Sequence, residues 1–145
     1  MADAPQSYSH HTRWDPLFHF FLLPVALIGL VSAVVHFFLH PHPLHSLLLI
    51  VFVLAGIVAI FKIRLYSLKV QDRVIRLEER LRLATLLPEA LRPRIPELTE
   101  PQLVAMRFAS DAELPALAQR TLNEKLSPDD IKKSIKNWRP DYWRV

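Results

Sequence analysis

The chain has 145 residues, of which 18 are Lys or Arg and 14 are Asp or Glu, giving a formal net charge of +4. It contains no cysteine, which excludes disulfides, thiolate metal sites and cysteine nucleophiles. Its two glycines, Gly29 and Gly56, lie inside apolar runs, so the sequence can form neither a P-loop nor a dinucleotide-binding turn. No residue pattern indicates a catalytic site, and we expect a protein that is not an enzyme.

Residues 1–16 form an N-terminal segment, and residues 17–61 contain no Asp, Glu, Lys or Arg. Two apolar runs, 17–39 and 44–61, span ~34 Å and ~27 Å as helices, which is enough to cross ~30 Å of hydrocarbon. The loop between them, residues 40–43, is short and holds two prolines. The sequence therefore predicts a transmembrane helical hairpin. A cleaved signal peptide fits poorly, because a single basic residue, Arg13, precedes the first run and a second span follows it.

The expected orientation follows from the basic residues. Lys and Arg are frequent directly after Phe61 and absent from the loop 40–43. By the positive-inside rule, both termini face the cytoplasm of a cytoplasmic membrane.

Small residues in the spans mark where helices can approach closely. Gly29 with Ala33, and Ala55 with Ala59, are each spaced by four residues, which is typical of helix–helix contacts in membranes. The two pairs lie at different depths, so we expect one pair to contact a second subunit or another membrane protein.

No helix breaker occurs between Gly56 and Leu87, so the second span is expected to continue into a cytoplasmic stalk, residues 62–87. Apolar residues follow one side of the stalk in alternating steps of three and four, the spacing of a coiled coil: Ile60, Ile63, Val70, Val74, Leu77, Leu81 and Ala84. A second, thinner apolar line consists of Leu68, Ile75 and Leu86. More than one side of the stalk is therefore expected to have a partner.

A basic ridge also follows the stalk, formed by Lys62, Lys69, Arg73, Arg76 and Arg80. The simplest interpretation is a solvated helix face. The alternative is attraction to anionic lipid, for which Lys62, Arg64 and Lys69 are nearest the membrane. Nucleic acid is not expected as a partner, because no recognition module or interleaved aromatic residues accompany the ridge.

Residues 88–98 hold three prolines and are predicted to be an ordered linker, followed by a C-terminal domain, residues 99–145. Three N-cap patterns predict three helix starts, at Thr99, Ser110 and Ser127. Pro115 would cost one hydrogen bond in a helix capped by Ser110, so the alternative for this helix is a start one or two residues later. A bundle this small has a marginal core, so we expect it to dock onto the second apolar line of the stalk. The aromatic tail from Trp138 is expected to pack over the bundle, with an exposed partner anchor as the alternative.

All seven histidines lie within the first 45 residues. Four of them gather at the loop end of the hairpin and are candidate metal ligands: His36, His40, His42 and His45. No carboxylate lies nearby in the sequence to orient them. His19, near the inner end of the first span, is a candidate ligand for haem or a pigment.

The run VQDRVIRLEERLRLATLLPEALRPRIPELTEPQLVAMRFASDAELPALA from Val70, with the closing IKKSIKNWRPDYWRV and the Pro-Leu-Phe-His of Pro16–His19, resembles a family of small, uncharacterised bacterial two-span inner-membrane proteins. The resemblance covers nearly the whole chain. It implies the two-span topology and a bacterial inner-membrane location, and it carries no activity and no catalytic residue.

These observations predict an all-α membrane protein: a two-helix hairpin, a long helical stalk and a small C-terminal three-helix bundle. We expect a non-enzymatic accessory or scaffolding protein that associates with itself or with a larger membrane complex, in contact with lipids and without a small-molecule substrate or cofactor. The alternative is a subunit that binds haem, a pigment or a divalent metal through its histidines.

Overall fold

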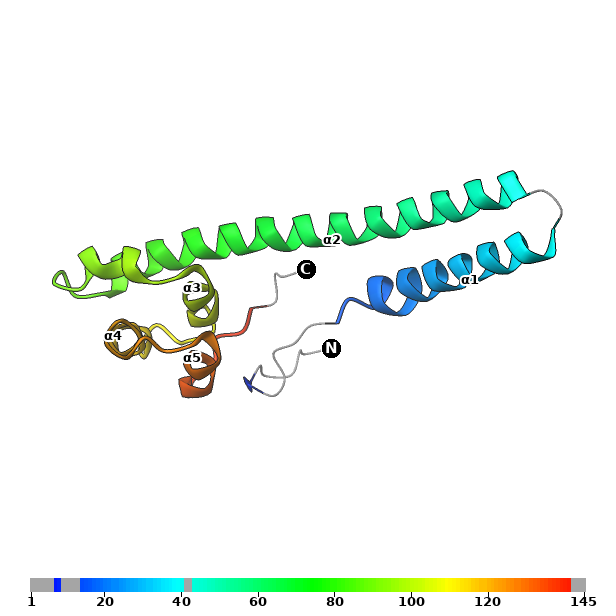
Figure 1. The fold of residues 1–145 in the computed structure, drawn as a ribbon. Coiled ribbons are helices and arrows are strands. Elements are labelled where there is room, and N and C mark those ends of the chain that lie inside the picture. Colours follow the sequence, from blue (N-terminus) through cyan, green and yellow to red (C-terminus); the bar gives the residue numbers. More distant parts are fainter. Residues whose placement is uncertain (1–6, 9–13, 41–42, 142–145) are drawn as a thin grey trace. The chain divides into compact units, whose positions relative to one another are not determined.

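The computed structural model describes residues 7–8, 14–40 and 43–141. In this part of the chain every regular element is a helix and no strand occurs, as the all-α prediction requires (Figure 1). The chain divides into two compact units. Of the described residues, one unit holds 14–40 and 43–68, and the other holds 69–141 together with 7–8. The helix α2 (Pro43–Leu86) contributes to both units.

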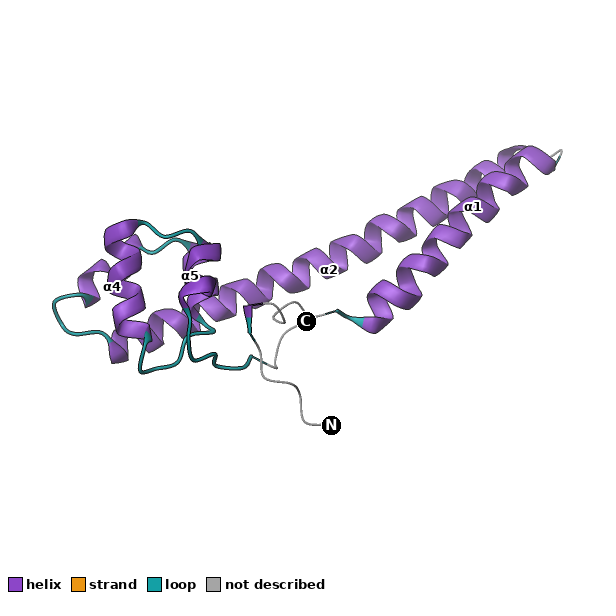
Figure 2. Ribbon diagram, turned by 90° about the horizontal axis from the view of Figure 1, so that it is seen from below, coloured by secondary structure: helices purple, strands orange, loops and turns teal. Residues whose placement is uncertain are grey.

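The first unit contains two antiparallel helical segments. The π-helix η2 (Leu17–Leu22) leads directly into α1 (Leu23–Leu39), and the N-terminal part of α2 runs back beside them (Figures 1 and 2). The two described helices Leu17–Leu39 and Leu44–Leu86 are long and apolar enough to cross a membrane, by length and composition. Only 6% of the most apolar window of each is buried, whereas the core helix of a soluble protein would be mostly buried.

The π-helical turn η2 ends just before Pro24, which is the second residue of α1. Proline has no N–H, and in an α-helix its ring crowds the carbonyl four residues earlier, here that of Phe20. In the wider turn the N–H of Leu23 donates to the carbonyl of Phe18, five residues earlier. The first predicted span is therefore helical from residue 17 to 39, with a changed helix type before the proline.

The second unit is a small bundle on the C-terminal turns of α2 (Figure 2). It consists of the 3-10 helix η3 (Arg92–Glu97), α3 (Glu100–Met106), α4 (Leu114–Glu124) and α5 (Pro128–Ser134). Its core joins Leu83 of α2, and Leu87 directly after α2, to the bundle. The residues essentially inaccessible to solvent are Leu83, Leu87, Leu103, Met106, Phe108, Leu114 and Ile131.

Two of the predicted helix starts have the expected cap. Thr99 and Gln102 form a capping box at α3, and the Ser127 hydroxyl accepts a 3.2 Å hydrogen bond from the Asp130 N–H at α5. The predicted start at Ser110 is wrong, because α4 begins at Leu114. Pro115 explains the shift, since proline is accommodated in the first turn, where no N–H is needed.

The stretch after α5 is not helical. Ala109 and Trp138 form an isolated antiparallel bridge, in which the Arg139 N–H donates to the Phe108 carbonyl at 2.7 Å. The Trp138 ring packs 5.0 Å from the Phe108 ring, centroid to centroid, at the edge of the core. Trp138 thus covers the bundle, as predicted, and residues 142–145 of the aromatic tail lie outside the described part.

Candidate functional site

The part of α2 in the second unit carries three distinct surfaces. One side docks onto the bundle, a second lines a cleft together with α3 and α5, and a third is apolar and exposed. Two residues of the predicted second apolar line lie on the docked side. Ile75 is buried, and Leu86 packs against the core. The remaining apolar contacts come from Leu83 of α2 and from Leu87, the residue that follows α2; neither belongs to the predicted second apolar line.

A buried ion-pair network fixes the docked side. The Arg82 guanidinium donates to the Asp111 carboxylate at 2.7 Å, to the Glu79 carboxylate at 3.2 Å and to the Ala109 carbonyl at 2.6 Å. The Glu79 side chain is only 5% exposed. Burial raises the pKa of the Glu79 carboxyl, and the positive charge of Arg82 opposes that rise. These contacts satisfy the polar groups that docking removes from water.

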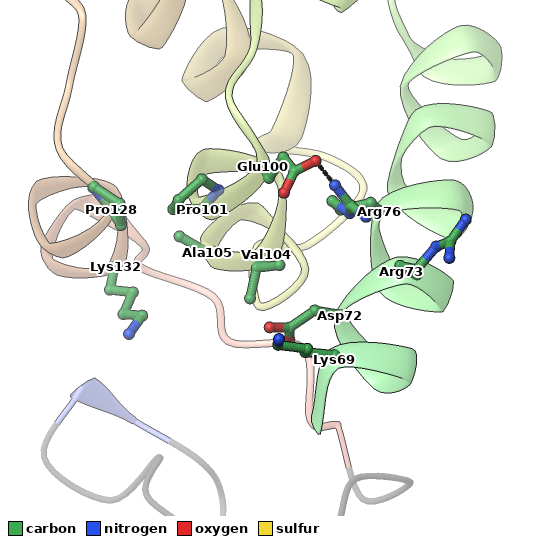
Figure 3. A pocket seen from close by; sticks show the side chains of 10 residues that line it. All are labelled: Lys69, Asp72, Arg73, Arg76, Glu100, Pro101, Val104, Ala105, Pro128 and Lys132. Atoms are coloured by element: carbon green, nitrogen blue, oxygen red, sulfur yellow. Dashed lines mark ion pairs between the residues drawn. The ribbon is translucent and has the colours of Figure 1, made fainter. Parts of the chain in front are cut away.

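A cleft of about 550 Å³ lies between α2, α3 and α5 (Figure 3). Four cationic and two anionic side chains line it, with an apolar wall of prolines, Val104 and Ala105; the lining comprises Lys69, Asp72, Arg73, Arg76, Glu100, Pro101, Val104, Ala105, Pro128 and Lys132. Figure 3 shows Lys69, Asp72 and Arg76 extending toward α3, whereas Arg73 points away from it.

Within the cleft, one ion pair is formed and one donor is left over. The Arg76 guanidinium contacts the Glu100 carboxylate (Figure 3). The Nε–H of Arg76 is buried and has no hydrogen-bond partner among the described residues. A buried unpaired N–H costs about 1–3 kcal/mol, so such a group marks a place where an acceptor is missing.

The third surface is the predicted heptad stripe. Val70, Val74, Leu77 and Leu81 are exposed by 61%, 49%, 61% and 62%. At 100° per residue this stripe lies roughly opposite the docked side of α2. It is therefore an apolar helix face that the chain's own bundle leaves uncovered.

At the end of the hairpin away from its loop, the predicted site residues Arg64 and His19 meet Asp15. Arg64 donates to the Asp15 carboxylate at 3.1 Å and lies 5.3 Å from the Phe18 ring centroid. The Nδ1 atom of His19 is 2.8 Å from the Asp15 carbonyl oxygen, which can only accept, so this contact assigns the proton to Nδ1 and leaves Nε2 without one in the neutral ring. Of the other predicted lipid contacts, Lys62 lies over the Tyr66 ring at 5.9 Å and Lys69 lines the cleft.

The structure brings together two of the four histidines at the loop end of the hairpin. The rings of His36 and His40 stack with their centroids 3.8 Å apart, and His45 is exposed on α2. His42 lies outside the described residues. Among residues 7–8, 14–40 and 43–141, no three side chains of His, Asp or Glu form a group able to hold a metal ion.

The two pairs of small residues have different surroundings. Ala33 is 1% exposed, and a Cβ placed on Gly29 would lie 4.0 Å from a methyl group of Val53 in α2. Ala55 and Ala59 are exposed, and a Cβ placed on Gly56 between them would meet nothing within 4 Å. The first pair thus lies at the contact between the two helices of the hairpin, and the second pair faces away from it.

Sequence reasoning found the basic ridge but not the cleft. Two charged residues of the cleft, Glu100 and Lys132, come from α3 and α5. No local sequence pattern specifies how these two helices pack onto α2. The same holds for Arg82, whose partner Asp111 is 29 residues away along the chain. The sequence does contain one indication that Glu79 is buried. It lies one helical turn from Ile75 and one turn from Leu83, so it shares a helix face with two apolar residues.

Comparison with known proteins gives a family without an assigned activity. No curated protein and no solved structure shows significant similarity to the chain. One family model matches residues 1–145, the entire sequence, and its description is "Family of unknown function (DUF6526)". The chain belongs to this family of unknown function.

Proposed function

We propose that the chain is a non-enzymatic membrane scaffolding protein that associates with a second copy of itself through α2. The observation that carries the proposal is the exposed apolar stripe Val70, Val74, Leu77 and Leu81. It lies among charged residues, outside the apolar segment that a bilayer could cover. An apolar stripe with heptad spacing on a water-exposed helix is the pattern of a coiled-coil interface.

The charges that flank the stripe support a parallel pair of helices. With Val74 and Leu81 at positions a, Arg73 occupies position g and Glu78 the following position e. In a parallel coiled coil, position g of one helix faces the next position e of its partner, so Arg73 would face Glu78 of the second copy. Both side chains are exposed, and two copies inserted in one membrane with the same orientation have parallel α2 helices.

The membrane part of the proposal rests on sequence and exposure. The helices Leu17–Leu39 and Leu44–Leu86 have the length and apolarity of spans, and the basic residues after Phe61 favour cytoplasmic termini at a bacterial inner membrane. The Asp15 and Arg64 ion pair lies where the spans would leave the hydrocarbon. The exposed face with Ala55 and Ala59 offers a further surface for the same assembly or for another membrane subunit.

The test is the oligomeric state of the full chain in mild detergent. Wild type should be a dimer by light scattering, and the double variant Leu77→Asp with Leu81→Asp should be a monomer, because it would bury two carboxylates per chain. A strictly monomeric wild type would overturn the proposal.

Charge reversal tests the parallel arrangement. Arg73→Glu and Glu78→Arg should each weaken dimerisation by roughly five- to thirtyfold, from about 0.5–1 kcal/mol per altered pair at two pairs per dimer. The double reversal restores opposite charges and should recover the wild-type association. As a geometric control, a Leu77→Cys chain should form a disulfide-linked dimer in membranes, whereas Asp72→Cys, at the outer position f, should not. Failure of the double reversal to recover association excludes the parallel register.

A further inference from the structure

The cleft between α2, α3 and α5 has the size and chemistry of a ligand site. Its volume of about 550 Å³ lies in the usual range for small-molecule sites. Lys69, Arg76 and Lys132 contribute three positive charges to the cleft and Asp72 and Glu100 two negative ones, whereas Arg73 lines the cleft but points away from α3 (Figure 3). The remaining net positive charge favours an anion.

The polar side chains of the cleft further narrow the chemical class of its ligand. Glu100 already holds one side of the Arg76 guanidinium, and Lys69 and Lys132 bring two further cationic groups to the cleft. Phosphate presents three anionic oxygens with a charge of about −1.5 to −2 at neutral pH, so one phosphate can accept hydrogen bonds from several such donors. Asp72 extends toward α3 as well and is an acceptor for a hydroxyl group of the same ligand (Figure 3).

The remaining wall excludes one large class of phosphate compounds. Pro101, Val104, Ala105 and Pro128 are aliphatic, and among the described residues no aromatic side chain lines the cleft. A nucleobase would therefore find no ring to stack on. Aliphatic walls instead suit the carbon backbone of a polyol.

We propose that this cleft binds a phosphate monoester of a polyol, with Lys69, Arg76 and Lys132 contacting the phosphate and Asp72 a hydroxyl group. The phosphate group can come from a soluble metabolite or from a lipid headgroup. The proposal concerns a side of α2 distinct from the apolar stripe and does not depend on self-association.

Binding of glycerol 3-phosphate to the full chain in detergent, measured by calorimetry, tests the proposal. Wild type should show saturable binding at millimolar concentrations or below, and glycerol should show none. Lys69→Ala and Lys132→Ala should each weaken binding by about five- to tenfold, the effect of losing one charge-assisted contact. Matched controls are Arg80→Ala on α2 and Lys133→Ala on α5, both outside the cleft, which should stay within about twofold of wild type.

Vesicles that contain phosphatidic acid present the same group as a lipid. Binding to glycerol 3-phosphate assigns a soluble ligand, and binding to the vesicles alone assigns a lipid; either supports the site if Lys69→Ala and Lys132→Ala weaken it. Absence of binding to both probes overturns the proposal. So does an equal loss in Lys132→Ala and Lys133→Ala, since general surface charge would then be responsible.

Discussion

Arg82 and Glu79 lie one turn apart on α2, with the guanidinium 3.2 Å from the carboxylate and both side chains at most 10% exposed. Arg82→Ala would leave a buried carboxylate and the Ala109 carbonyl without their donor. Loss of one partner from a buried pair typically costs about 3–5 kcal/mol of stability. We therefore expect a markedly lower melting temperature by circular dichroism of the full chain. Arg80→Ala, at an exposed position two residues earlier, should change stability by less than about 0.5 kcal/mol, and equal melting of the two variants would contradict the assigned role of Arg82.

The raised pKa of Glu79 predicts how stability depends on pH. Because the folded-state pKa lies above the ordinary value of 4.5, the folded state holds this proton more tightly than the unfolded state. The contribution of Glu79 to stability is therefore fully present below that ordinary value and is lost as the pH rises through the raised one. Glu79→Gln cannot ionise, so its stability relative to wild type should increase with pH over this interval. Parallel stability curves for the two proteins would show that burial does not control this carboxyl.

Leu83 and Leu81 are close in sequence but lie on different sides of α2. Leu83 is fully buried in the bundle core, whereas Leu81 is 62% exposed on the apolar stripe. Leu83→Ala should cost about 2–5 kcal/mol through lost burial and a cavity. Leu81→Ala should leave the melting of the monomer nearly unchanged and instead weaken dimerisation. Light scattering and thermal melting of both variants separate the two effects, and a loss of stability in Leu81→Ala monomers would contradict this division.

Lys125 ends α4 in a left-handed conformation, with φ of 55° and ψ of 44°. Among the described residues it is the one non-glycine position with positive φ. Glycine adopts this conformation without a Cβ clash and is the usual residue at such helix ends. Lys125→Gly should therefore stabilise the bundle by about 0.5–1 kcal/mol, measured as a higher melting temperature. A lower melting temperature would show that the Lys125 side chain makes a contact that outweighs this strain.

What the sequence predicts well is local. The apolar runs, the caps at Thr99 and Ser127 and the end of α2 before Pro88 each follow from a few adjacent residues and their backbone hydrogen bonds. The exposed stripe was also visible, because heptad spacing is a property of a single helix.

What the sequence does not predict depends on packing between distant segments. Ile131, Ile135 and Trp138 have the spacing of one helix face, but Trp138 lies in a bridge to Ala109, because backbone groups of residues 137 and 139 pair with residues 108 and 110. The cleft likewise requires α3 and α5 to be placed beside α2, which local periodicity does not specify. In the hairpin, the spacing of Gly29 and Ala33 equals that of Ala55 and Ala59, and only the structure distinguishes the pair that contacts the other helix.

Gly29 lies at the contact between the two helices of the hairpin and Gly56 does not, so substitutions at the two glycines form a matched pair of variants. A Cβ on Gly29 would lie 4.0 Å from a methyl group of Val53, so we expect the further atoms of Gly29→Leu to crowd the contact between the helices. Gly56→Leu meets no atom of the same chain within 4 Å of its Cβ. We expect Gly29→Leu to destabilise the hairpin by about 1–3 kcal/mol, seen as faster proteolysis of the chain in detergent, and Gly56→Leu to leave proteolysis unchanged.

If Gly56→Leu also leaves dimerisation unchanged, the face with Ala55 and Ala59 is not part of the contact between copies; a weaker dimer places it there. Equal proteolysis of wild type and Gly29→Leu would contradict the close approach of α1 and α2 at this position.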